Sequence, residues 1–141
     1  MQSLIPVLAV SEMHATIRFY TDVLGFKVDL TLPNAEGGLD HASLSRGEAA
    51  LMLSPLRDAP KEGEKLGTGV VLYLTIDEGE DVDALFERAR AAGAPVVQEP
   101  TDQFWGHRDW GISDPDGYVV YGSKVVKQVD PAEMLAQAAA V

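Results

Sequence analysis

The sequence predicts an α+β fold in which two tandem β-α-β-β-β modules form curved mixed sheets around a cleft. One observation behind this prediction is a repeat. Gly25 and Gly93 each end a predicted helix, and each is followed at nearly equal distance by a hairpin glycine, Gly47 after 22 residues and Gly117 after 24. The other observation is size. The 141 residues, 46% of them hydrophobic, suffice for one compact core. Each module, at roughly 55 residues, is too small to cover both faces of its own sheet.

The first module is predicted over 4–54. It starts with a short apolar run, 4–10, in which Pro6 favours an edge strand, and Ser11 is the expected N-cap of the following helix. Apolar residues four, three and four positions apart form the buried stripe of that helix, namely Met13, Ile17, Tyr20 and Leu24. The remaining strands are predicted at 26–32, 40–45 and 49–54, with a turn at Arg46 and Gly47 between the last two.

A polar linker, 55–69, leads to the second module, predicted over 70–125. Its elements are a strand at 70–76, a helix at 81–92, a short strand at 96–99, and two strands at 110–113 and 118–125 around a turn at 114–117. The order Asp130, Pro131, Glu133 predicts the start of a C-terminal helix over 130–140. Because the two halves are expected to share a core, the whole chain, 1–141, is predicted to be one domain.

Composition excludes several classes of function. The chain has no cysteine, so disulfides, thiolate nucleophiles and cysteine-based metal sites are ruled out. A net charge of −11 makes nucleic acid a poor partner, because nucleic-acid binding needs basic side chains that neutralise phosphates. No apolar run approaches the roughly 20 residues that span a bilayer, so no membrane partner is expected. The N-terminus lacks the features of a signal peptide, and the expected location is the cytoplasm.

Four segments of the chain resemble the vicinal oxygen chelate superfamily. They are IPVLAV at 5–10, FYTDVLGF at 19–26, WG at 105–106 and DPDGY at 114–118. This superfamily includes glyoxalase I, extradiol dioxygenases, fosfomycin-modifying transferases and bleomycin-resistance proteins. The resemblance covers roughly residues 4–125 and agrees with the duplicated module order. It is specific for the fold and weak for function, since the shared residues form helix stripes and turns.

The resemblance also implies where a metal ion would bind. Metal-using members carry a His or Glu in the first strand and a carboxylate in the last strand of each module. The corresponding positions here are Ile5, Val71, the segment 51–53 and Tyr121, which hold apolar or phenolic side chains. A metal site needs at least three protein ligands. We therefore expect no metal, no other cofactor and no catalytic residues of the metal-dependent kind.

The three histidines give little support for a metal site at other positions of the chain. His14 is expected to face solvent on the first helix, and His107 is expected in a loop. His41 lies on a predicted strand, where a half-buried structural role and a ligand contact are equally compatible with the pattern. No second ligand stands at metal-binding spacing from any of them, so a relocated metal site around His41 remains the less favoured alternative.

Aromatic residues gather before the final hairpin, where Phe104, Trp105 and Trp110 fall within seven positions. Aromatic faces bind planar or cationic groups. Trp105 is given more weight as a core residue and Trp110 as a ligand-facing one. Arg108 and Asp109 flank this cluster and either orient a polar ligand or form an ordinary surface pair.

The sequence thus predicts a metal-independent binding protein of the bleomycin-resistance type. It would sequester an aromatic or cationic small molecule in a groove of a homodimer. The predicted ligand-binding residues are Trp110, Trp105, Phe104, His41, Tyr73, Tyr121 and Arg108. The alternatives are a glyoxalase-like or dioxygenase-like metalloenzyme with a shifted ligand set, and a metabolite carrier. The excess of acidic residues in 67–141, with a net charge of −8 against −3 in 1–66, is at most a weak indication of a cationic ligand.

Overall fold

The computed structural model describes residues 1–58 and 60–140. Contacts divide the chain into two units. Unit 1 consists of Met1–Thr68 together with the turn Asp114–Tyr118, and unit 2 consists of Gly69–Ser113 and the chain from Val119 onward. Each unit contains one four-stranded mixed sheet, so the predicted α+β class and the module order are confirmed. No helix in the described ranges is both long and apolar enough to cross a membrane.

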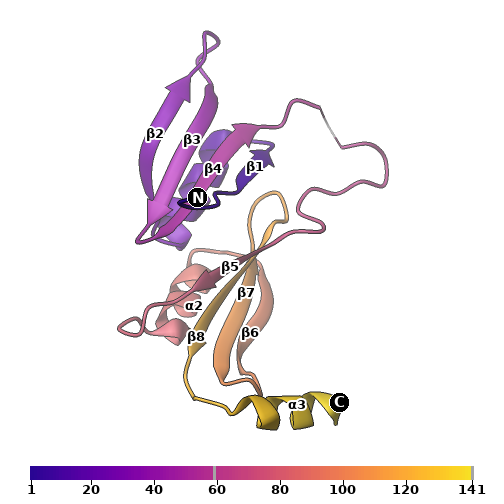
Figure 1. Ribbon diagram of the computed structural model, residues 1–141. Coiled ribbons are helices and arrows are strands. Elements are labelled where there is room, and N and C mark those ends of the chain that lie inside the picture. Colours follow the sequence, from indigo (N-terminus) through magenta and orange to yellow (C-terminus); the bar gives the residue numbers. More distant parts are fainter. Residues whose placement is uncertain (59, 141) are drawn as a thin grey trace. The chain divides into compact units, whose positions relative to one another are not determined.

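Unit 1 contains four strands and one helical segment. They are β1 (Val7–Val10), α1 (Met13–Arg18) continued by the π-helical turn η1 (Phe19–Val23), β2 (Lys27–Pro33), β3 (Leu39–Arg46) and β4 (Ala49–Pro55). The strand order is β1-β4-β3-β2 (Figure 1), with β1 parallel to β4 and the other pairs antiparallel. The sheet follows the predicted strands closely because alternating side chains specify its register.

The start of the first module differs from the prediction at two points. The strand begins at Val7, after Pro6, which has no N–H for the ladder and instead accepts a hydrogen bond from Met52 N at 3.0 Å. The helix is capped by Glu12 and not by Ser11. The extended backbone of Glu12 lets its carboxylate accept hydrogen bonds from the amides of His14 and Ala15.

One face of the first sheet packs against the helical segment and forms the core of unit 1. Tyr20 stands at its centre, 1% exposed, with the rings of Phe19 and Phe26 packed edge-on against it at 5.1 and 5.9 Å. The buried strand residues are Leu8, Val10, Ala42, Leu44, Leu51 and Leu53. They occupy alternate positions, so their neighbours along each strand face the opposite side of the sheet.

Unit 2 repeats this arrangement. Its elements are β5 (Val71–Thr75), α2 (Val82–Ala91), β6 (Val96–Asp102), β7 (His107–Ser113), β8 (Val119–Val125) and α3 (Pro131–Ala139). The strand order is β5-β8-β7-β6 (Figure 1), again with the first pair parallel. Asp130 caps α3, as predicted, but no residue of that helix is buried.

Strands β6 and β7 are both longer than the sequence predicts. The polar residues 107–109 lack the apolar alternation on which the prediction relied, yet they pair with 123–125 of β8. His107, expected in a loop, therefore begins a strand. Strand β6 runs through Pro100 with two register shifts against β7, which accommodate a residue that cannot donate to the ladder.

The core of unit 2 is built around Trp110. Its indole N–H donates to Val82 O on α2 at 2.8 Å, and its ring packs against Phe86 at 6.1 Å. A Cβ at Gly122 would lie 2.3 Å from this ring, so the glycine makes room for the indole. Trp110 is only 1% exposed and lies on the α2 side of the sheet. The expectation that Trp110 faces a ligand is therefore wrong, because burial of its large ring with a satisfied N–H places it in the core.

The turn between β7 and β8 belongs to unit 1, where Asp114 holds it. Asp114 is 3% exposed, and its carboxylate accepts hydrogen bonds from Tyr20 Oη at 2.9 Å and from the backbone amides of Asp116 and Tyr118 at 2.9 Å each. Burial raises the pKa of Asp114, while the hydrogen bonds oppose that rise. Burial also raises the pKa of Tyr20 far above its usual range, so the phenol is neutral and acts as the donor.

We expect Tyr20→Phe to lower the free energy of unfolding by about 1–3 kcal/mol, because the variant leaves a buried carboxylate without one of its donors. Urea denaturation measures this change. The control is Tyr118→Phe, which removes a hydroxyl that donates to Ala9 O at 3.0 Å in a partly exposed position. The control is expected to cost less, and equal costs for the two variants would contradict the role given to Asp114.

Candidate functional site

The candidate site lies on the face of the second sheet opposite α2, which we call the open face. Register pairs define it: Tyr73 lies beside Tyr121, Asp109 beside Ser123, and Gly111 beside Tyr121. Neighbouring residues of β7 and β8 that point the other way, such as Trp110 and Val120, are buried in the core. The open face therefore gathers the polar and phenolic side chains of three adjacent strands.

Three of these side chains form one hydrogen-bonded cluster. Tyr73 Oη donates to Ser123 Oγ at 2.6 Å, and His107 Nδ1 lies 3.0 Å from Ser123 Oγ and 3.3 Å from Tyr73 Oη. With Tyr73 donating to Ser123, the serine hydroxyl can donate in turn to His107 Nδ1. Tyr73 remains 51% exposed. The cluster thus holds an aromatic ring at the surface in a fixed orientation.

Tyr121 lies beside this cluster. Its ring lies over Gly111, where an added Cβ would come within 2.8 Å of Tyr121 Cε1. The missing side chain at Gly111 lets the phenol lie close to the sheet. Tyr73 and Tyr121 are register partners on β5 and β8, so the sheet presents two aromatic side chains together.

The aromatic cluster predicted before the last hairpin is split by the structure. Phe104 is 37% exposed, Trp105 is half-buried, and their rings pack edge to face at 4.9 Å in the turn before β7. Trp110 lies in the core. The sequence favoured Trp105 as the core residue and Trp110 as the exposed one, whereas in the structure Trp110 is the more buried of the two. Alternation along β7 decides this, because Trp110 shares the α2 side with Ile112.

Arg108 forms ion pairs with two carboxylates of the same unit. Its guanidinium donates to Asp83 on α2, with Nε–Oδ1 at 2.8 Å and Nη2–Oδ2 at 3.2 Å, and to Asp102 on β6 at 3.1 Å. These two carboxylates raise the pKa of Arg108 above its usual range. The side chain therefore ties α2 to the edge of the sheet on the side opposite the open face.

His41 lies in unit 1, on the face of the first sheet that the helix does not cover. His41 Nε2 is 2.6 Å from Ser43 Oγ on the same strand. Its neighbours on β2 by register are Leu32, opposite His41, and Leu30, opposite Ser43, which are 48% and 50% exposed. His41 is thus a polar group on a largely apolar surface.

The side chains do not fit a divalent metal ion. The first strand of each module carries no His or Glu on its uncovered face. Moving the alignment with metal-using relatives by a position or two along these strands does not bring one there. The positions are Val7 and Ala9 on β1, and Val71, Tyr73 and Thr75 on β5. No group of three or more His, Asp or Glu side chains in 1–58 and 60–140 is arranged to hold a metal. A divalent ion prefers carboxylate or imidazole ligands.

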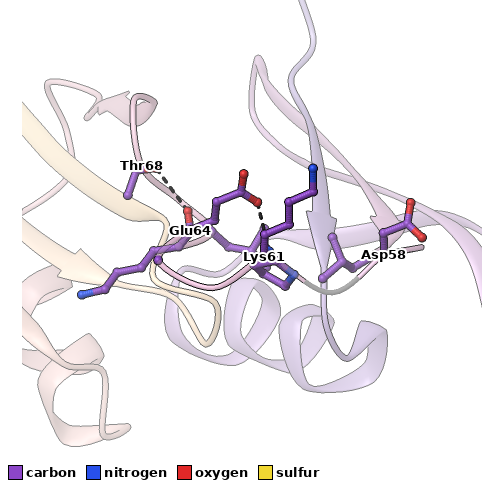
Figure 2. A pocket seen from close by; sticks show the side chains of 9 residues that line it. Asp58, Lys61, Glu64 and Thr68 are labelled. Atoms are coloured by element: carbon purple, nitrogen blue, oxygen red, sulfur yellow. Dashed lines mark hydrogen bonds between the residues drawn. The ribbon is translucent and has the colours of Figure 1, made fainter.

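The linker contains a hollow of about 690 Å³, lined by residues between Leu56 and Thr68. Figure 2 shows its side chains, with Lys61 and Glu64 joined by the hydrogen bond from Lys61 N to Glu64 Oε2, 3.0 Å long. Thr68 Oγ1 donates to Lys65 O at 3.1 Å. None of the described residues that line this hollow is aromatic. It therefore offers less for recognition than the open face.

Sequence reasoning missed Ser123, Gln98 and Gln103, and it considered Asp109 only as a residue flanking the aromatic cluster. Asp109 and the two glutamines form a second hydrogen-bonded group on the open face, in which both glutamine amides donate to Asp109. A signal for the shared face of Asp109 and His107 was present. Extending the period of two backward from Ile112 through Trp110 places Gly111, Asp109 and His107 together on the other face.

Comparison with known proteins identifies the family and several similar folds. The model of the Glyoxalase/Bleomycin resistance protein/Dioxygenase superfamily matches residues 4–121. An uncharacterised protein of Mycobacterium bovis is 33% identical over 95% of this chain and 90% of its own length. An uncharacterised protein of Mycobacterium tuberculosis is also 33% identical, over 95% of this chain and 81% of its own.

Two solved structures are similar over most of the chain. The crystal structure of TioX from Micromonospora sp. ML1 has a TM-score of 0.68 and 26% identity, covering 87% of this chain and 98% of TioX. TnmS3, an antibiotic binding protein from Streptomyces sp. CB03234, has a TM-score of 0.66 and 25% identity, covering 86% of this chain and 93% of its own.

We expect Arg108→Ala to lower the free energy of unfolding by about 1 kcal/mol, less at high salt, because it breaks a partly exposed network of three charges. Denaturation at low and high ionic strength measures this change. Lys27→Ala serves as the control, since it removes a single exposed pair with Asp29 at 3.4 Å. Similar small costs for both variants, with no salt dependence, would contradict a structural role for Arg108.

Proposed function

Because the chain belongs to the Glyoxalase/Bleomycin resistance protein/Dioxygenase superfamily, we propose that it is a metal-independent binding protein of the bleomycin-resistance type. It sequesters an aromatic or cationic small molecule in the cytoplasm, without chemical conversion. The observation that carries this proposal is Tyr73, half exposed on the open face and held by Ser123 and His107. The similarity to TnmS3 at 25% identity supports it.

The open face has the composition of a binding surface for a planar molecule. Tyr73 and Tyr121 supply aromatic area with few rotatable bonds, and such rings stack on planar groups. His107 and Ser123 supply hydrogen bonds that fix the orientation of a bound molecule. A few polar groups within an aromatic surface are typical of sites for small molecules.

The proposal includes a homodimer whose groove completes the site. Exposed apolar side chains support it: Val7 is 58%, Leu30 50% and Leu32 48% exposed on the uncovered face of the first sheet. Apolar area of this kind commonly marks an interaction surface. A second copy of the chain would bury it, and light scattering on the purified protein measures the number of chains.

The second candidate is a glyoxalase-like or dioxygenase-like metalloenzyme, favoured by the family alone. It would need ligands outside the positions that metal-using relatives employ, with His41 as the first candidate. The partner of His41 is the hydroxyl of Ser43. A serine hydroxyl is a poor ligand for a divalent ion, so this pair gives the alternative little support.

We expect a ligand of the proposed class to raise the melting temperature of the protein. A ligand at about 100 times its dissociation constant stabilises the folded state by about 2.7 kcal/mol. Thermal-shift measurements against glycopeptide antibiotics, mitomycin-like quinones and common metabolites would detect this. Tyr73→Ala should abolish the shift, because it removes the exposed ring.

Tyr73→Phe is the matched control for this experiment. It keeps the ring and removes only the hydroxyl, so most of the shift should persist if stacking dominates. A ligand whose shift is unchanged in Tyr73→Ala would place binding elsewhere on the protein and contradict the proposed site.

We expect the purified protein to carry no stoichiometric divalent metal, and elemental analysis measures this directly. About one tightly bound ion per chain would contradict the binding hypothesis and favour the enzyme. His41→Ala then separates the two candidates. Metal content and any activity would vanish in the enzyme, whereas a binding protein would show only a modest change in affinity.

A further inference from the structure

Asp109 is a carboxylate in an unusual environment. It is 6% exposed, and both of its side-chain donors bind the same oxygen. Gln98 Nε2 lies 2.7 Å and Gln103 Nε2 2.9 Å from Oδ1. Both donors are neutral amides, so they orient the carboxylate without balancing its charge. A carboxylate that is this buried is normally paired with a cation.

The side chain of Asp109 points to the open face. Its two neighbours on β7 point the other way, since Arg108 binds Asp83 on α2 and Trp110 binds Val82 O. The register partner of Asp109 on β8 is Ser123, which belongs to the cluster with Tyr73 and His107. Directly opposed residues of antiparallel strands have Cα atoms about 4.5–5.5 Å apart. The carboxylate therefore lies next to the proposed binding surface.

The second oxygen of this carboxylate, Oδ2, remains available. No hydrogen bond to it occurs within 1–58 and 60–140, and the ion pairs of that part of the chain do not include Asp109. Every side-chain nitrogen or oxygen that is fully buried in those residues has a partner. Oδ2 has none, so it is not fully buried.

We propose that Asp109 is the anchor for a positively charged group of the ligand, a protonated amine or an amidinium carried on an aromatic frame. Gln98 and Gln103 hold Oδ1, which leaves Oδ2 to accept a charge-assisted hydrogen bond. The neighbouring tyrosine rings favour the same charge through cation–π attraction. This inference rests on the proposed binding function and narrows its ligand class to aromatic cations.

The test compares two probes that differ in one group, 2-naphthylmethylammonium and neutral 2-naphthylmethanol. Titration followed by ligand-detected NMR gives both dissociation constants. The wild-type protein should bind the ammonium about tenfold more tightly, as expected for a hydrogen bond to a charged group. In Asp109→Asn the preference should fall to about one, because the amide oxygen still accepts from both glutamines while the charge is gone.

Asp102→Asn is the matched control. It removes the same charge from a residue that pairs with Arg108 on the side away from the open face, and the preference for the ammonium should persist. An equal loss in both variants would overturn the inference, because it would point to the general negative charge of the protein.

The remaining outcomes separate this inference from the proposed function. Equal binding of both probes to the wild-type protein overturns the anchor and leaves the aromatic binding surface standing. Binding of neither probe overturns both. The wild-type comparison needs no variant, so it decides the question even where Asp109→Asn does not fold.

Discussion

The buried carboxylate of Asp114 is the constraint on which the course of the chain depends. The strands β7 and β8 belong to unit 2, yet the turn between them belongs to unit 1, where Asp114 accepts the hydroxyl of Tyr20 and two backbone amides. A buried carboxylate is tolerated only when its hydrogen bonds are satisfied. The helix that carries Tyr20 and the turn that carries Asp114 therefore belong to one core, although 94 positions separate them.

The two sheets share one arrangement but carry different side chains on their uncovered faces. In each, a helix covers one face and alternation directs the other side chains to the uncovered face. The first sheet presents apolar residues there, such as Leu30 and Leu32, around His41. The second presents Tyr73, Tyr121, His107 and Asp109. Duplication of one module thus gives one uncovered face that is largely apolar and one that is polar and aromatic.

Charge on the second sheet is divided between its faces. Arg108 meets Asp83 and Asp102 on the side of α2, where the three charges form a network. One residue later, Asp109 faces the opposite side with only neutral donors. The net charge of the chain does not reveal this difference. In the proposed binding function, this single carboxylate beside two aromatic rings bears more directly on ligand selection than the acidic excess of the whole second half.

Local sequence patterns were enough to predict the module order, the helices that end at Gly25 and Gly93, the hairpin at Gly47 and the cap at Asp130. These features depend only on periodicity and on the conformations that glycine and the cap residue allow. The same patterns placed Tyr73 and Tyr121 on strands, but they assigned Trp110 to the ligand and left His107 in a loop. Both of those points depend on tertiary packing. Which face of a strand is buried depends on the helix that packs against it, and the polar start of β7 is a strand because β8 pairs with it. The period of two along β7 indicates which face Asp109 and His107 share. The contact of Tyr73 with Ser123, 50 positions away, and the convergence of Gln98 and Gln103 on Asp109 depend on how the strands pair, which no local pattern specifies.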